Sequence, residues 1–214
     1  MGRYGKGILG SFVGKVGTVI GSSWRGISYM RSLPVFKTGR TPTDKQLEQQ
    51  MRFGLMTRFL APAKPLLEVG FKNYAQQQTA YNGALSYNIK NAITGVYPAL
   101  EVDYPMIMIS RGDLPGAEVP SADSTVAATV TFNWTDNTGR GKAKDTDQLM
   151  ILAHCPALQE SVAGIELAAR SAATADVVLP GHFSGQVVHL WIAWQSANGK
   201  ELSGTAYLAT VNVA

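Results

Sequence analysis

Residues 125–135 read Thr-Val-Ala-Ala-Thr-Val-Thr-Phe-Asn-Trp-Thr, and an apolar side chain stands at every second position from Val126 to Trp134. This alternation is typical of a β-strand that buries one face. Further strands are expected in the same part of the chain at 104–111, 147–154, 163–170, 174–180, 186–196 and 202–213. Seven short strands separated by turn residues predict an antiparallel β-sandwich.

The segment 186–196 differs from the others because both of its faces are apolar. One face carries Val187, His189, Trp191 and Ala193, and the other carries Val188, Leu190, Ile192 and Trp194. Such a strand is expected at the centre of a sheet or beneath a helical module. Asn198-Gly199 follows it and predicts a hairpin to the last strand.

The amino-terminal third has another pattern. Residues 2–31 contain eight of the chain's 22 glycines among β-branched and aromatic residues, which favours strands over a helix. Strands are expected near 16–23 and 27–32, with a reversal at Trp24-Arg25-Gly26. A two-stranded hairpin is marginally stable alone, so this one is expected to pack on its own helices or on another chain.

Three helical segments are expected next. The first starts with Thr41 as N-cap and Pro42 at the first helical position, and a shorter one follows Pro62. Apolar residues of the first helix recur at four-residue intervals: Leu47, Met51, Leu55 and Phe59. The third covers 76–94. The predicted fold class is α+β, in which a β-hairpin plus helices precede an all-β sandwich.

The charge changes along the chain in step with this pattern. The first 75 residues carry twelve Lys/Arg and three Asp/Glu, whereas the rest carry seven and twelve. We therefore expect two modules, a basic one at 1–101 and an all-β one at 102–214. The basic module is a candidate for phosphate contact with nucleic acid through Arg25, Arg31, Arg40, Arg52 and Arg58. The alternatives are a solvated surface or a surface that complements the acidic half of a neighbouring copy.

Several functional classes lack support in the sequence. No apolar run is long enough to span a membrane, and glycines interrupt the start, so neither a membrane span nor a signal peptide is expected. Synthesis in the cytoplasm is expected, and the single Cys155 suits a reducing compartment. His154, His182 and His189 fall in separate expected elements without ligand spacing. No metal, cofactor or catalytic residue is expected, and we expect no enzyme.

The stretch Gly-Ile-Leu-Gly-Ser-Phe-Val-Gly-Lys-Val-Gly-Thr-Val-Ile-Gly-Ser-Ser-Trp-Arg-Gly-Ile-Ser-Tyr-Met-Arg-Ser-Leu-Pro at 7–34 resembles the start of an uncharacterised family widespread in Bacteroidota. Thr-Asp-Lys-Gln-Leu and Ser-Tyr-Asn-Ile-Lys-Asn-Ala-Ile-Thr-Gly continue this resemblance, which extends through the chain. The family implies no activity and no functional residue. The Gly-rich start before a Thr-x-x-Gln helix is also similar, more loosely, to small phage-type structural proteins.

Residues 124–213 resemble a fibronectin type III or related immunoglobulin-like sandwich. In this resemblance Val-Thr-Phe-Asn-Trp-Thr is the second strand, with Trp134 in the core, and His-Leu-Trp-Ile-Ala-Trp-Gln-Ser-Ala-Asn-Gly-Lys-Glu is the last hairpin. The chain departs from the pattern at the start of the sixth strand, where Val187 to His189 replace the expected tyrosine.

We therefore expect a non-enzymatic structural or interaction protein that assembles with copies of itself or with partner proteins, in a virion-like or surface assembly. The expected assembly interface consists of Val16, Val19, Trp24, Ile27 and Tyr29. One alternative is nucleic-acid binding by the basic module. The other is a sandwich that binds glycans or proteins through exposed aromatics such as Trp194 or Phe183 and through the loops 111–123 and 136–147.

Overall fold

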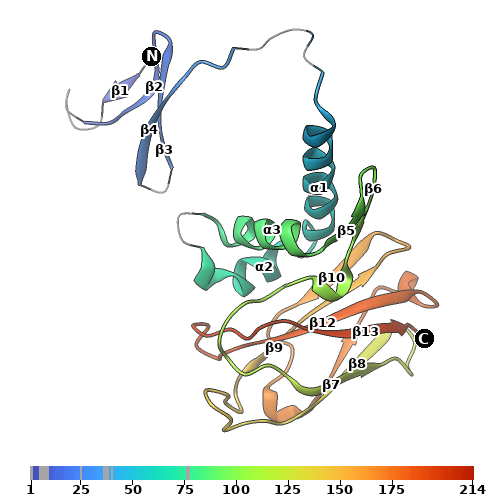
Figure 1. Ribbon diagram of the computed structural model, residues 1–214. Coiled ribbons are helices and arrows are strands. Elements are labelled where there is room, and N and C mark those ends of the chain that lie inside the picture. The colour runs from blue at the N-terminus through green and yellow to red at the C-terminus, as the bar shows by residue number, and fades with distance from the viewer. Residues whose placement is uncertain (1, 5–9, 25, 36–38, 40, 76–77) are drawn as a thin grey trace. The chain divides into compact units, whose positions relative to one another are not determined.

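The structure is a computed structural model that describes residues 2–4, 10–24, 26–35, 39, 41–75 and 78–214 (Figure 1). The chain divides into two compact units, residues 1–43 and residues 44–214. We call them the amino-terminal unit and the main unit. The division lies before the first helix and not at the expected boundary of 101/102, because the helices pack on the sandwich and share its core.

The amino-terminal unit is an antiparallel sheet in the order β1-β2-β3-β4. Its strands are β1 (Arg3–Tyr4), β2 (Phe12–Val16), β3 (Val19–Trp24) and β4 (Ile27–Ser32). The hairpin of β3 and β4 was predicted, but the single strand expected at 16–23 is two strands. Gly17, with a φ of 58°, makes the turn between them, and Val16 pairs with Val19.

The main unit contains the expected sandwich. One sheet has the order β11-β8-β7 and the other β10-β9-β12-β13. The strands are β7 (Glu118–Asp123), β8 (Thr129–Thr135), β9 (Gln148–Cys155), β10 (Glu160–Gly164), β11 (Thr174–Val178), β12 (Val187–Gln195) and β13 (Ala206–Asn212). Val130, Phe132 and Trp134 of β8 are buried against the four-stranded sheet, so the alternation of this strand correctly predicted its core face.

Three helices cover the other face of the four-stranded sheet: α1 (Asp44–Leu60), α2 (Lys64–Gly70) and α3 (Ala80–Asn91). Figure 1 shows α2 and α3 on one side of β9 and β12, with β7 and β8 on the opposite side. Trp191 and Leu152 of the sheet share a core with Leu60 and Leu67 of the helices. The apolar residues on both faces of β12 are thereby explained, and its central position is confirmed.

One segment differs in kind from the expected element. Residues 104–111 form no strand: Tyr104–Met106 is a 3-10 turn, and the residues after it are irregular although buried. The side chain of Asn88 exchanges two hydrogen bonds with the backbone of Met108, and Thr205 Oγ1 accepts from the next two backbone N–H groups. These side chains replace the strand partner that a buried backbone would otherwise need.

The boundaries of other elements also shift. The helix expected from Thr41 begins at Asp44. The third helix is shorter than 76–94 because Thr79 caps it, accepting from the Asn82 N–H, and a hairpin of β5 (Ile93–Val96) and β6 (Ala99–Val102) follows it. The strand expected at 163–170 is wrong beyond Gly164, where β10 ends and Glu166 soon follows with a φ of 58°. None of the helices in the described ranges has the length and apolar character required to cross a membrane.

Candidate functional site

The amino-terminal sheet has no hydrophobic core among its described residues. Among the described residues of 2–43, only Gly21 is buried. Large apolar side chains are exposed instead, including Trp24 at 53% and Met30 at 71% of their surface. Sheets in folded proteins cover their apolar faces with another layer. This sheet is therefore the strongest candidate for a contact surface in the described part of the chain.

The register of the strands divides the sheet into two different faces. Directly paired residues share a face, and successive residues of a strand alternate between faces. Val16 pairs with Val19 and Val19 pairs with Ser32, while Gly14 pairs with Gly21 and Gly21 pairs with Met30. The face that these residues share, which we call the neutral face, carries Phe12, Gly14, Val16, Val19, Gly21, Ser23, Ser28, Met30 and Ser32.

The opposite face, called the cationic face, contains the Lys and Arg side chains of these strands outside the masked positions. Lys15 pairs with Ile20 and Ile20 with Arg31, so two cations flank one aliphatic residue in a row across three strands. Trp24 pairs with Ile27 on the same face. The complete set is Arg3, Val13, Lys15, Ile20, Ser22, Trp24, Ile27, Tyr29 and Arg31.

The five residues of the expected interface do not lie together. Val16 and Val19 are on the neutral face, whereas Trp24, Ile27 and Tyr29 are on the cationic face. Each of the five is at least about a third exposed, from 37% for Val19 to 53% for Trp24. Sequence reasoning identified residues of the right sheet but did not separate its faces, because the turn at Gly17 sets the register.

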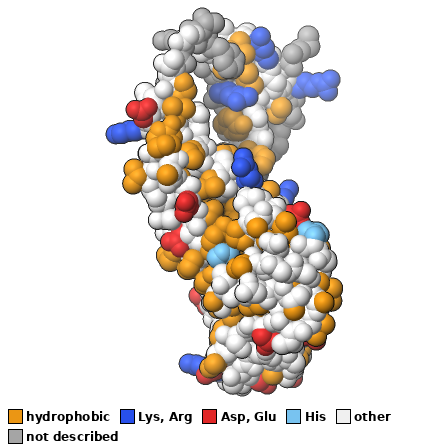
Figure 2. Space-filling model, turned by 90° about the vertical axis from the view of Figure 1, so that its right-hand side faces the viewer, with side chains coloured by type: hydrophobic (Ala, Val, Ile, Leu, Met, Phe, Trp, Pro, Cys, Tyr) orange, Lys and Arg blue, Asp and Glu red, His pale blue; other side chains and the backbone are white. Residues whose placement is uncertain are grey.

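The charge difference between the two units is sharper than the difference between residues 1–75 and the rest of the chain. Residues 1–43 contain seven Lys/Arg and no Asp/Glu, whereas residues 44–214 contain twelve and fifteen. In the surface view, Lys and Arg side chains lie among exposed hydrophobic side chains in the upper part of the picture (Figure 2). The amino-terminal unit is therefore purely cationic, which favours anionic partners and disfavours contact between its own charged surfaces.

The five arginines expected to contact nucleic acid are placed very differently. Arg31 lies on the cationic face, while Arg25 and Arg40 lie outside the described residues. Arg52 binds Glu48 of the same helix through Nε at 2.9 Å and through a terminal nitrogen at 2.8 Å. Arg58 lines a cavity of about 240 Å³ in the main unit. Of the three arginines that the structure describes, Arg31 belongs to the amino-terminal unit, and Arg52 and Arg58 belong to the main unit.

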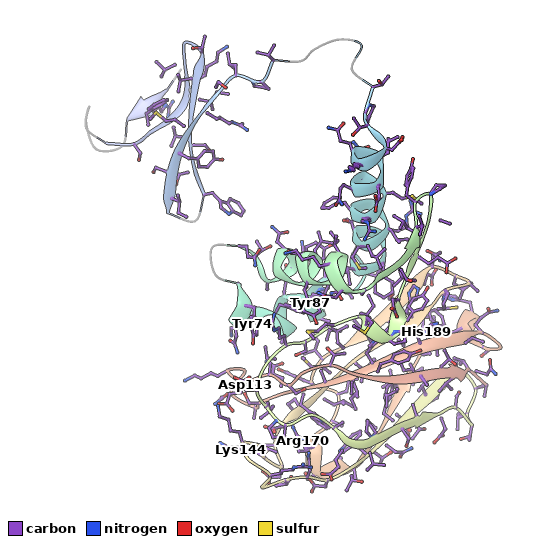
Figure 3. The ribbon with its side chains drawn as sticks, viewed as in Figure 1. Tyr74, Tyr87, Asp113, Lys144, Arg170 and His189 are labelled. Atoms are coloured by element: carbon purple, nitrogen blue, oxygen red, sulfur yellow. The ribbon has the colours of Figure 1, made fainter. Side chains whose placement is uncertain are left out.

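Two histidines of the main unit do converge, contrary to expectation. His154 of β9 and His189 of β12 are directly paired across the four-stranded sheet, on the side covered by helices. Tyr104 stacks on His189 with 3.9 Å between ring centres, and Phe59 of α1 lies edge-on to His154 at 4.8 Å. Figure 3 shows His189 on this side of the molecule. The pair could not be predicted from the sequence, because it depends on the register in which β9 and β12 are hydrogen-bonded.

The surroundings of these histidines indicate a packing role. His154 Nδ1 lies 2.9 Å from Ser161 Oγ, and His189 Nδ1 lies 2.8 Å from the hydroxyl of Tyr207. Burial is the main cause that lowers the pKa of His154 to about 4, and the neighbouring His189 lowers it further. Burial also lowers the pKa of His189. Both rings are therefore neutral at pH 7 and join α1 and the 104–106 turn to the sheet.

A cavity adjoins His154, and its rim carries polar groups from several elements. It is lined by Leu55, Arg58, Phe59, Leu100, Glu101, Val102, Tyr104, His154 and Gln159. No cluster of three or more His, Cys, Asp or Glu that could hold a metal ion occurs in the part of the chain that the structure describes. His182 lies apart from the paired histidines and contacts Glu160 at 2.7 Å.

The prediction that exposed aromatic residues of the sandwich bind a glycan or a protein is wrong for the two residues named. Trp194 and Phe183 are both fully buried, so neither can contact a glycan or protein at the surface. Trp194 packs edge-on against Trp134 at 5.1 Å, and the guanidinium of Arg170 lies 4.5 Å from the centre of its ring. Strong apolar character on both faces of β12 reflected two cores rather than a binding surface.

The loops 111–123 and 136–147 are joined by a buried network around Arg170 (Figure 3). Its guanidinium donates to Asp147 Oδ2 at 3.1 Å, to Asn137 Oδ1 at 2.5 Å and to the Pro115 carbonyl at 2.9 Å. Burial lowers the pKa of Arg170, and Asp147 opposes this effect. Because a buried cation needs such partners, the network holds both loops in one conformation.

The chain was compared with curated proteins, with solved structures and with protein families. None of the curated proteins matches the chain. A solved structure described as "Solution structures of the fn3 domain of human collagen alpha-1(XX) chain" is similar over 49% of this chain and 90% of that chain, at 12% identity and a TM-score of 0.36. A family model described as "Family of unknown function (DUF6266)" matches residues 11–209. The chain therefore belongs to the family of unknown function DUF6266.

Proposed function

We propose that the protein is a non-enzymatic structural protein that assembles through its amino-terminal sheet. The observation that carries this proposal is that only Gly21 is buried among the described residues of 2–43, while large apolar side chains cover both faces. Burying one such side chain stabilises a complex by about 1.5–3 kcal/mol. A sheet without a second layer gains this free energy only from contact with another surface.

The main unit has the opposite character, because its two cores are complete without a partner. An assembly built by the amino-terminal sheets can therefore carry the main unit as a prefolded domain. The finer subtype that we propose for this domain is an immunoglobulin-like sandwich of the fibronectin type III kind. The fourth strand of the sandwich, β10, pairs with the third strand, β9, and this pairing supports that choice. In constant-type immunoglobulin domains the fourth strand instead belongs to the sheet of the first and second strands. A virion-like or surface assembly suits this division of roles.

Molar mass measured by size-exclusion chromatography with light scattering tests the proposal. The full chain is expected to exceed the monomer mass and to grow larger with concentration. The fragment 44–214, which keeps both cores, is the control and is expected to remain monomeric. A full chain that stays monomeric at millimolar concentration would overturn the proposal.

A second candidate function is nucleic-acid binding by the cationic face. Lys15 and Arg31 lie on the same face as Trp24 and Tyr29, and this combination suits phosphate contacts with base stacking. Retention on single-stranded DNA should then weaken steeply with salt. The double substitution Lys15→Glu and Arg31→Glu should abolish it, whereas Lys142→Glu in the main unit should not. Absence of retention at low salt removes this candidate.

A further inference from the structure

We propose that the neutral face of the amino-terminal sheet packs on the neutral face of a second copy of the chain. This inference rests on the proposed function and assigns the self-association to one of the two faces. Two sheets would then form a sandwich between copies, with Val16, Val19 and Met30 of each copy in the shared layer. The cationic faces would remain on the outside of the pair.

The distribution of charge selects this face and this occupant. The described strands carry their cations, Arg3, Lys15 and Arg31, on the cationic face only. Residues 1–43 contain no Asp or Glu that could neutralise them. Packing the cationic face on its own copy would therefore place like charges together in an interface, which opposes association. The neutral face can meet its own copy without that repulsion, as a symmetric dimer interface requires.

The shape of the neutral face also suits sheet-on-sheet packing. Gly14 and Gly21 are paired at its centre, and Phe12 covers Gly21, where an added Cβ would come within 2.2 Å of the Phe12 carbonyl oxygen and 2.7 Å of its ring. Ser23 and Ser28 are paired beyond them. Val16, Val19 and Met30 are the exposed apolar side chains of this face, and they can interdigitate with those of an opposing sheet at the usual spacing of about 10 Å.

Neighbouring residues of β4 provide matched variants for the test. Met30 lies on the neutral face and Tyr29 on the cationic face, and both are exposed, at 71% and 44%. Each is replaced by lysine in the full chain, so that both variants gain the same charge. The self-association constant is measured by sedimentation equilibrium. Met30→Lys is expected to weaken association at least about 100-fold, and Tyr29→Lys less than about 3-fold.

A mixing experiment identifies the occupant. Chains carrying Met30→Lys and chains carrying Met30→Glu are each expected to associate poorly, but an equimolar mixture is expected to recover association, because opposite charges then meet across the interface. Failure of the mixture to recover would show that the face meets a surface other than its own copy, and would overturn the inference.

The remaining outcomes separate this inference from the proposed function. If the unsubstituted chain associates and Tyr29→Lys disrupts it while Met30→Lys does not, the inference is wrong and the proposed function stands. If neither substitution changes an association that is present, the inference is also wrong. If the unsubstituted chain is a monomer at every concentration, the proposed function fails and the inference fails with it. A circular dichroism spectrum of each variant confirms that the sandwich is folded.

Discussion

The amino-terminal sheet and the four-stranded sheet of the main unit are both rich in apolar side chains, but their surroundings are opposite. Met150 and Ile151, neighbours on β9, are each fully buried, one beneath the helices and the other against the second sheet. Met30 and Tyr29, neighbours on β4, are both exposed. Strand pattern alone therefore does not determine stability. A sheet becomes a stable layer only when its faces are covered.

The largest expected effect concerns Trp191, which is fully buried between the four-stranded sheet and the helices. Trp191→Ala should lower the free energy of unfolding by about 4 kcal/mol, because it leaves a large cavity and frees the Tyr104 carbonyl that the indole N–H binds at 3.1 Å. Urea unfolding followed by circular dichroism measures the loss. A change below about 1 kcal/mol would contradict the assignment of this core.

Asp147 provides the next largest effect. Asp147→Ala should destabilise the main unit by about 3 kcal/mol, because it removes the carboxylate that lies 3.1 Å from the guanidinium of the fully buried Arg170. The matched control is Asp176→Ala, since Asp176 is exposed and binds only the Thr131 hydroxyl among the hydrogen bonds described for its side chain. That control should change stability by less than about 1 kcal/mol in the same urea titration. Equal effects of the two substitutions would show that the ion pair of Arg170 with Asp147 does not stabilise the main unit.

Acid should loosen the main unit through His154. The folded chain keeps this ring neutral down to its pKa of about 4, whereas the unfolded chain binds a proton near pH 6.5. The contribution of His154 to stability is therefore complete above pH 6.5 and is lost as the pH falls toward 4, by up to about 3 kcal/mol. His154→Phe should flatten this part of the stability profile.

The smallest expected effect is that of Trp24, the amino-terminal counterpart of Trp191. Trp24→Ala should change the free energy of unfolding of the main unit, measured by urea titration, by less than about 0.5 kcal/mol. The reason is that this side chain is 53% exposed and belongs to the other unit. A loss near that of Trp191→Ala would abolish the contrast between the two units, since it would require Trp24 to belong to a shared core.

Much of the fold of the main unit could be predicted from the sequence. Short strands separated by turn residues predicted the sandwich, and the two apolar faces of β12 predicted a strand that is central in its sheet or covered by helices; β12 is both. The segment 104–111 was misread because side chains of Asn88 and Thr205, distant in sequence, bind its backbone. Such partners leave no periodic signal in the segment that they stabilise.

The candidate site was less predictable than the fold. Composition identified the amino-terminal residues that lack a core, but their assignment to two faces depends on the register set at Gly17. The pairing of His154 with His189 depends in the same way on the register of β9 and β12. Register is a tertiary property that a hydrophobic pattern constrains only where one face is buried. Both of these strand pairs have apolar residues on both faces.

The middle position of β9 and β12 has a consequence for local opening. Each is paired with a strand on both edges, β9 with β10 and β12, and β12 with β9 and β13, so its amide hydrogens exchange with solvent only when these strands separate. Because both faces of the two strands are also buried, such a separation disrupts both cores. Deuterium uptake at these amides should therefore be the slowest in the chain and should report the global unfolding of the main unit. The amides of β4, at the edge of a sheet whose described residues form no core, should take up deuterium orders of magnitude sooner in the unassociated chain.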